Sequence, residues 1–212
     1  MSDITFDNLY GGLDTRPGIV TKNSKLLFMT EASNIDIIGQ NVRRARGQVL
    51  KLQIPDVAIL GIAKHEIDGL FYMRAICSDG KYYRVDPVNS IVLEAKNGLS
   101  ENAKPYFFQG RDNNLICLTG TNDPFADDGI TITDCGLFTQ RNVYGTCGIS
   151  HANKIFIAAG TRLYYSATYT LNDWLSEGDA GFLDFNGDIT AINKFGSYIY
   201  VRTKRDIYIL TG

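Results

Sequence analysis

The sequence predicts an all-β fold built from repeated antiparallel sheets, and three observations carry this prediction. The chain of 212 residues contains 12 tyrosines, 11 phenylalanines and 21 glycines, a balance typical of β-rich proteins. Short apolar runs alternate with clusters of turn residues, and one outline recurs about every 43 residues. Two stretches of ten or more residues with a 3.6-residue period, which a helical repeat would need, are not found, so we expect little helix.

Each repeat consists of an apolar anchor residue, a polar turn and one or two apolar bursts. Two clear copies read GISHANKIFIAAGTRLYYSA from Gly148 and AINKFGSYIYVRTKRDIYIL from Ala191. The four anchors are Ile62, Tyr106, Ile149 and Ile192, at intervals of 44, 43 and 43 residues. A period of this length marks units that each form one supersecondary element and stack on their neighbours to bury their faces.

The contents of one period identify the unit as a sheet. Four strands are expected at Ile59–Ala63, Leu70–Cys77, Tyr82–Val85 and Ile91–Leu93, separated by Gly69, Asp79-Gly80 and Pro87 with Asn89. Four short antiparallel strands per repeat are typical of a β-propeller blade. Continuous apolar runs such as LFYM and IFIA favour burial on both faces, as in a blade between two blades.

The whole chain is therefore expected to form a β-propeller-like structure with four blades, or five, in one structural domain. A segment 1–55 precedes repeats at about 56–98, 104–139, 143–186 and 187–212. A fifth unit is conceivable because Ile19 lies 43 residues before Ile62, although the same stretch could be a short helix capped by Ser24. The last repeat is short, so we expect it either to be an incomplete blade, with the chain stopping inside a blade of a longer parent, or to be completed by N-terminal residues or a neighbouring molecule.

Composition argues against several classes of protein. The formal net charge is −2, which gives no long-range attraction to nucleic acid or membrane. The N-terminus has no apolar targeting region, and no run of about 18 apolar residues occurs, so an unexported protein is expected. The four cysteines, Cys77, Cys117, Cys135 and Cys147, lie far apart and are expected to be small apolar core residues in a reducing compartment.

No combination of residues indicates an enzyme, a metal site or a cofactor site. His65 and His151 recur in the loop after an anchor, which favours a structural role. The acidic stretch Asn122–Gly129 lacks the spacing of a calcium loop and is expected to be a solvated loop. Asp184 and Asp188 flank an Asn-Gly pair that predicts a hairpin between Phe185 and Ile189, and a glycosidase pair there has no cleft to support it.

Two features are candidates for contact with a partner. Arg43, Arg44 and Arg46 form the one basic cluster, interpreted either as a charged edge strand that resists pairing or as a docking patch for an acidic subunit or DNA phosphates. Trp174 lies in an inter-strand loop, where it either anchors a partner or packs beneath its own loop. The tetrad Thr203–Asp206 is expected to be a hairpin tip.

Three segments resemble the tail or neck β-propeller proteins of tailed bacteriophages, which include packaged-DNA stabilisation and tubular tail proteins. They are FDNLYGGLDTRPG at 6–18, EASNIDIIGQNVRRARG at 31–47, and the stretch from Ile149 to the final Leu-Thr-Gly. The resemblance implies a non-enzymatic virion component, in a ring near the portal, that assembles in the host cytoplasm and helps to retain DNA. Its implied partners are portal and tail proteins, further copies of itself, and packaged DNA through non-specific contacts.

A rival interpretation is a carbohydrate-binding or scaffolding propeller unrelated to phages. Aromatic residues recur near the rim of the units at Tyr83, Tyr164 and Tyr208, where they could line equivalent sugar sites. Strand packing explains these tyrosines equally well. A glycoside hydrolase, acting through Asp184 and Asp188, is a third class.

Overall fold

The computed structural model describes residues 35–38, 41–44, 54, 57–86, 89 and 91–211, and the chain divides into two units, Met1–Lys51 and Leu52–Gly212. In the first unit, strand β1 (Ile35–Ile38) pairs antiparallel with β2 (Asn41–Arg44). The conceivable fifth repeat around Ile19, the alternative helix at Ser24, and Arg46 lie outside the described residues.

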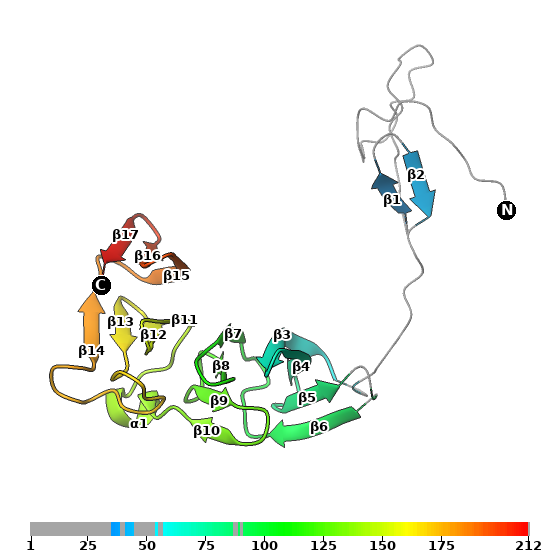
Figure 1. Cartoon of the computed structure of the whole chain (residues 1–212), viewed down its shortest axis with the longest axis horizontal. Helices are drawn as coiled ribbons and strands as arrows, with labels where there is room; N and C mark the ends of the chain where they lie inside the picture. The colour runs from blue at the N-terminus through cyan, green and yellow to red at the C-terminus, as the bar shows by residue number, and fades with distance from the viewer. Residues whose placement is uncertain are drawn as a thin grey trace, which may run out of the picture. The chain divides into compact units, whose positions relative to one another are not determined.

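The second unit contains four antiparallel sheets in which strand order follows chain order (Figure 1). The first sheet consists of β3 (Ile59–Ile67), β4 (Leu70–Cys77), β5 (Tyr82–Asp86) and β6 (Ile91–Lys96). The second sheet consists of β7 (Tyr106–Gln109), β8 (Leu115–Leu118), β9 (Phe125–Asp127) and β10 (Ile132–Asp134). The third sheet consists of β11 (Cys147–His151), β12 (Lys154–Ala159), β13 (Arg162–Tyr165) and β14 (Gly181–Asp184). The fourth sheet has three strands, β15 (Ile189–Phe195), β16 (Tyr198–Thr203) and β17 (Ile207–Thr211).

The all-β prediction is confirmed, and each of the four strands expected in the first repeat is present. In the described part of the chain the single helix is α1 (Leu137–Arg141), five residues long. No helix among the described residues is long and apolar enough to cross a membrane. The hairpin tip expected at Thr203–Asp206 is also present, closed by a hydrogen bond from the Thr203 amide to the Asp206 carbonyl.

Two-residue turns set the register of three sheets at corresponding positions. Asp68 and Gly69 join β3 to β4, and Ala152 and Asn153 join β11 to β12; all four residues have positive φ, as a type I′ turn requires. The corresponding turn between β15 and β16 contains Gly196, also at positive φ. Because the turns align, the first residue of β4, of β12 and of β16 occupy the same position in their sheets.

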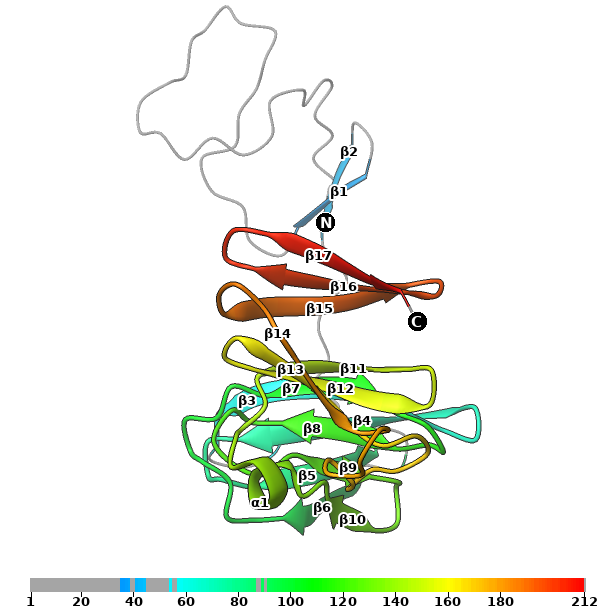
Figure 2. The same ribbon diagram turned by 90° about the vertical axis from the view of Figure 1, so that its left-hand side faces the viewer.

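The four sheets stack face to face, with the first strand of each sheet beside the first strand of the next. Strand β3 contacts β7, β7 contacts β11, and β11 contacts β15. Figure 2 shows the fourth sheet lying over the third. Three apolar clusters fill the three spaces between consecutive sheets, so the second and third sheets are buried on both faces.

The structure corrects two details of the register. Ile149 and Ile192 belong to one cluster between the third and fourth sheets, so the anchors face each other across that space and do not share a face. A one-residue slip in the alignment of repeats explains this, because adjacent residues of a strand point to opposite faces. The Asn-Gly pair before Asp188 joins β14 to β15, which lie in different sheets, so it forms no hairpin.

Candidate functional site

A buried ionic network joins the first and second sheets, and Asp127 on β9 is its centre. The Asp127 carboxylate is fully buried and accepts hydrogen bonds from Arg74 Nε at 2.8 Å and from Arg84 Nη2 at 2.7 Å. Tyr82 Oη donates to the same carboxylate at 2.7 Å, and the amide of Gly129 donates at 2.8 Å. Two strands of one sheet are thus tied to a single carboxylate of the next sheet.

The donors keep Asp127 ionised despite its burial. Burial alone would raise its pKa, but hydrogen bonds from Arg84, Tyr82 and the Gly129 amide, with the charge of Arg74, lower it to about 2. Burial and the neighbouring carboxylate raise the pKa of Tyr82, so its hydroxyl stays a donor. The network is a built electrostatic contact between sheets, with no feature of an acid-base pair poised near neutral pH.

His65 extends the network, and burial favours its neutral form. It lies on β3 with its side chain fully buried, and its Nε2–H donates to the carbonyl of Asn113 in the second sheet. Burial lowers its pKa, and among the described residues Nδ1 has no hydrogen-bond partner, 3.9 Å from an Asp127 oxygen. The expected loop position of His65 is therefore wrong, while its structural role, a contact between two sheets, agrees with the interpretation from sequence.

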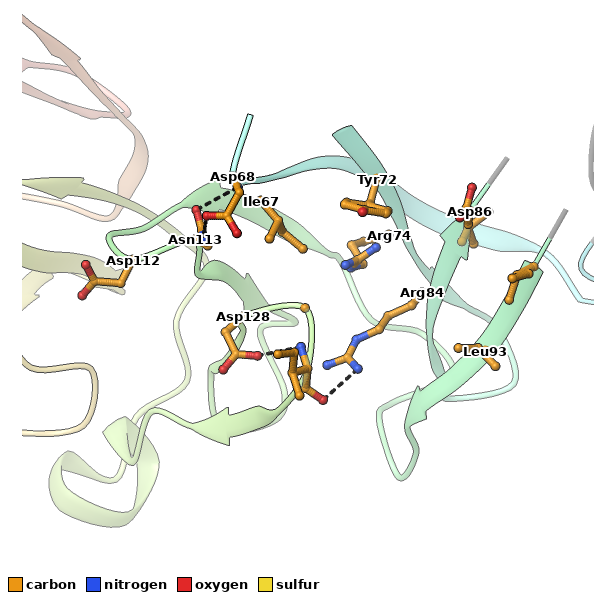
Figure 3. A pocket seen from close by; sticks show the side chains of 14 residues that line it. Ile67, Asp68, Tyr72, Arg74, Arg84, Asp86, Leu93, Asp112, Asn113 and Asp128 are labelled. Atoms are coloured by element: carbon orange, nitrogen blue, oxygen red, sulfur yellow. Dashed lines mark hydrogen bonds between the residues drawn. The ribbon is translucent and has the colours of Figure 1, made fainter. Parts of the chain in front are cut away.

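A cavity of about 550 Å³ opens beside this network (Figure 3). Its polar lining includes Tyr72, Arg84 and Asp128, and its apolar lining includes Ile67 and Leu93. The guanidinium of Arg84 also donates to the carbonyl of Ile130 at the cavity wall. The cavity combines apolar walls with a few oriented polar groups, as sites for small polar molecules do.

The fourth sheet carries a broad apolar face that no described residue covers. Register places Phe195 opposite Tyr198, Tyr200 opposite Ile209, and Arg202 opposite Ile207. These side chains point away from the cluster shared with the third sheet, because strand residues alternate between faces. We call this surface the fourth-sheet face; its large apolar members are Phe195, Tyr198, Tyr200, Ile207 and Ile209.

At the other end of the stack the first sheet has a face on which large side chains are exposed and over which no other described sheet lies. Register places Ile62 opposite Ala75, Lys64 opposite Met73 and Glu66 opposite Phe71. The other side of β3 packs toward the second sheet through Ala63 and His65. We call this surface the first-sheet face; Ile62 and Phe71 are more than half exposed on it, and the Lys64 ammonium lies 3.4 Å from the centre of the Phe71 ring.

Several residues singled out in the sequence have structural roles. Trp174 is fully buried and its Nε1–H donates to the carbonyl of Cys135 at 2.7 Å, which favours the interpretation that it packs beneath its own loop. All four cysteines are free and buried, as expected. The acidic stretch is not a solvated loop, because it includes the buried strand β9.

The remaining candidates are not brought together into a site. Arg162 pairs with Asp184 at 2.7 Å, whereas Lys204 pairs with Asp188 at 3.2 Å, so each carboxylate has its own exposed cation. His151 ends β11, away from any acid-base partner that the structure records. Among the described residues no group of His, Cys, Asp or Glu could hold a metal ion.

The rim tyrosines do not form equivalent surface sites. Tyr164 is buried and packs on Phe182 at 5.7 Å between ring centroids, whereas Tyr83 donates its hydroxyl hydrogen to Asp79. Tyr208 packs edge-on against Phe185. Strand packing therefore explains the recurrence of these aromatic residues.

The basic cluster is described only in part. Arg43 and Arg44 lie on β2, opposite Asp36 and Ile35 of β1. Only the backbone of these strands is described, so the choice between an edge strand and a docking patch stays a prediction.

Sequence reasoning missed the Asp127 network. Its signal was an arginine inside each of two apolar strands, Arg74 in LFYMRAIC and Arg84 in YYRV. A charge in the middle of a buried strand requires a buried partner.

No protein-family model matches the chain, and no curated protein matches it. Among solved structures, the computationally designed Ika4 protein aligns with a TM-score of 0.52 at 14% identity, over 78% of this chain and 99% of that chain. BBS1N, solved in complex with ARL6DN, aligns with a TM-score of 0.52 at 8% identity, over 75% of this chain and 53% of that chain. The chain thus spans about half the length of BBS1N. At these identities the likeness shows the fold alone, which is all-β and β-propeller-like.

Proposed function

We propose that the protein is a non-enzymatic structural component of a tailed-phage virion, placed in the tail or neck, where it acts in assembly and in retention of DNA. In this proposal each of the four sheets is one propeller blade, and the last blade is completed by another segment or molecule. The resemblance of the three sequence segments to phage tail and neck proteins supports the virion role.

One structural observation supports an assembly role above all others: at each end of the stack, residues 57–211 leave large apolar side chains exposed on the outer face of the sheet. Soluble monomers rarely expose large contiguous apolar surfaces, and such surfaces mark sites of protein contact. The buried contacts between sheets, including the Asp127 network, make the stack a stiff body that can transmit position between its two ends. A stiff unit with an exposed apolar face at each end is better suited to a structural role than to catalysis.

Purified particles of the phage whose genome encodes the chain test this proposal directly. Mass spectrometry of washed virions should detect the protein at several copies per particle, and mixing the purified protein with portal and tail proteins should give a complex of defined mass. A protein that is absent from the particles and indifferent to every virion protein would overturn the assignment.

The basic cluster allows a test of DNA contact within the same role. The triple variant Arg43→Ala, Arg44→Ala, Arg46→Ala should weaken binding to duplex DNA and make the affinity less dependent on salt. A protein that contacts fewer phosphates releases fewer counterions when it binds. If only binding to a virion protein is lost, the cluster is a protein docking patch. Unchanged binding to both partners would assign it to the edge-strand interpretation.

Carbohydrate binding is the second candidate, and the cavity beside the Asp127 network favours it. This cavity presents the aromatic ring of Tyr72 together with carboxylate and amide groups of Asp68, Asp128 and Asn113. A glycan array should then show a ligand whose binding is lost in Tyr72→Ala and kept in Tyr164→Phe, because Tyr164 is buried elsewhere. An array without signal would remove this candidate.

A further inference from the structure

We propose that the fourth-sheet face of one copy of the chain docks on the first-sheet face of a second copy, in a head-to-tail contact that continues the stack of sheets. This inference rests on the assembly role proposed above and names the occupant of both uncovered faces. Its evidence is a comparison of equivalent positions in successive sheets.

The fourth-sheet face has the residues of an interior contact, although no described sheet lies next to it. Leu163 and Ile207 occupy equivalent positions in their sheets. Leu163 pairs with the fifth residue of β12, and Ile207 pairs with the fifth residue of β16. The next sheet covers Leu163 completely, whereas Ile207 is 69% exposed. Ile207 therefore carries an apolar side chain where the pattern provides a covering sheet.

The first-sheet face shows the same mismatch from the other side. Phe71, Ile155 and Ile199 are each the second residue of the strand that follows the turn. Ile155 and Ile199 are 4% exposed because the preceding sheet covers them, but Phe71 is 57% exposed. The first-sheet face is thus the half of an interior contact that receives a preceding sheet.

The two faces are therefore the complementary halves of one kind of interface. Each sheet has a forward face, which points toward the next sheet along the chain, and a backward face, which points toward the preceding sheet. Each of the three spaces between consecutive sheets is filled by the forward face of one sheet and the backward face of the next. The fourth-sheet face is a forward face and the first-sheet face is a backward face. A contact between them joins unlike surfaces, so it is heterologous and either closes into a ring or extends as a filament.

Charge supports the same pairing. Arg202 is the fifth residue of β16, the position that Arg74 holds in β4, and Arg74 reaches across to a carboxylate of the next sheet. Among the described residues no carboxylate pairs with the Arg202 guanidinium. The first-sheet face offers the exposed carboxylate of Glu66 beside Phe71. A second copy thus supplies both the apolar cover and an anion for Arg202.

Mass photometry and sedimentation velocity of the full chain and two face variants test the proposal. The wild type should form dimers or larger species, and both Ile207→Asp and Phe71→Asp should be monomers. Leu175→Asp is the matched control, because Leu175 is a large apolar residue 55% exposed on a loop outside both faces and outside the cavity. It should associate like the wild type. Far-UV circular dichroism should be unchanged in all three variants, since each substitution is at an exposed position.

Mixing the two monomeric variants distinguishes a head-to-tail contact from a symmetric one. Ile207→Asp keeps an intact first-sheet face and Phe71→Asp keeps an intact fourth-sheet face, so the mixture should form a heterodimer and nothing larger. Arg202→Glu should weaken self-association about tenfold, and adding Glu66→Arg should restore it.

Three results would overturn the proposal: a monomeric wild type at every concentration, association of Phe71→Asp alone, or a mixture that stays monomeric. Association of Phe71→Asp alone would indicate contact between two fourth-sheet faces. These experiments contain no virion protein other than the chain itself, so a negative result would overturn the self-association and leave the virion role open. Conversely, absence of the protein from purified virions would overturn the virion role without contradicting self-association of the chain.

Discussion

Replacing Asp127 by asparagine should destabilise the protein more than any other single loss of charge in its sheets. The substitution keeps the shape of the side chain but removes the charge that both Arg74 and Arg84 face. Arg74 is buried, so its guanidinium cannot recover water. Removing one partner from a buried ion pair costs about 3–5 kcal/mol, because the remaining charge stays buried and uncompensated.

The pKa of Asp127 gives a second, independent magnitude. Its value of about 2, against 3.8 for an ordinary aspartate, means that the folded protein favours the ionised form. At 1.36 kcal/mol for each pKa unit, the shift corresponds to about 2 kcal/mol of stability. This contribution is present above about pH 4 and is lost as the pH falls toward 2, because the unfolded chain takes up the proton first. We therefore expect Asp127→Asn to lose about 3 kcal/mol at pH 7 and to lose less in acid.

Urea unfolding followed by tryptophan fluorescence and circular dichroism measures this loss. The matched control is Asp134→Asn in the adjacent strand β10, where Lys96 pairs with an exposed carboxylate at 2.9 Å. An exposed pair contributes less than about 1 kcal/mol, so the control should unfold close to the wild type. Equal stability of Asp127→Asn and Asp134→Asn would refute the argument that the network holds the first two sheets together.

Three further substitutions probe other buried contacts. Trp174→Phe leaves the buried carbonyl of Cys135 without its donor and should cost about 1–3 kcal/mol in urea unfolding followed by circular dichroism, since Trp174 is the single tryptophan; a loss below the error of the measurement would contradict that contact. His65→Gln should flatten the fall in stability between pH 7 and 5, because burial lowers the pKa of His65 and the unfolded chain therefore binds the proton first; an unchanged slope argues against it. Gly148→Ala places a Cβ 2.7 Å from the carbonyl oxygen of Phe156, so the melting temperature should fall by an amount equivalent to about 1–3 kcal/mol of stability. An unchanged melting temperature would contradict this steric argument and show that the backbone of the third sheet shifts to accept the methyl group.

The period and the strands could be predicted because they depend on local pattern. Apolar runs such as Leu70–Cys77, bounded by Gly69 and Gly80, give a strand wherever they fall, and four of them in 43 residues give a sheet. The two glycines adopt positive φ at turns, which other residues adopt at a cost. This information is contained within a few residues of sequence.

The faces and the buried network could not be predicted, since they depend on alignment between sheets. A slip of one residue exchanges the two faces of a strand, and the sequence similarity aligned Ile149 with Ile192 although they face each other. Asp127 lies among other aspartates in a polar stretch, so nothing local distinguishes its buried carboxylate from partly exposed neighbours such as Asp123 and Asp128. Its partner Arg74 is 53 residues away along the chain.

Ionic and apolar contacts both join neighbouring sheets in the stack. The difference between them bears on how the outer faces of the stack could bind another molecule. The first two sheets meet through an ionic network around Asp127 in addition to an apolar cluster, whereas the third and fourth meet through an apolar cluster that includes Leu163 and Val201. Apolar contact is tolerant of small changes in shape, while a buried ion pair demands one geometry. The fourth-sheet face is of the tolerant kind, with Arg202 as the single charge among five large apolar side chains. A surface of that composition gains affinity from area and uses one charge to fix orientation, which suits a contact that forms between separate molecules.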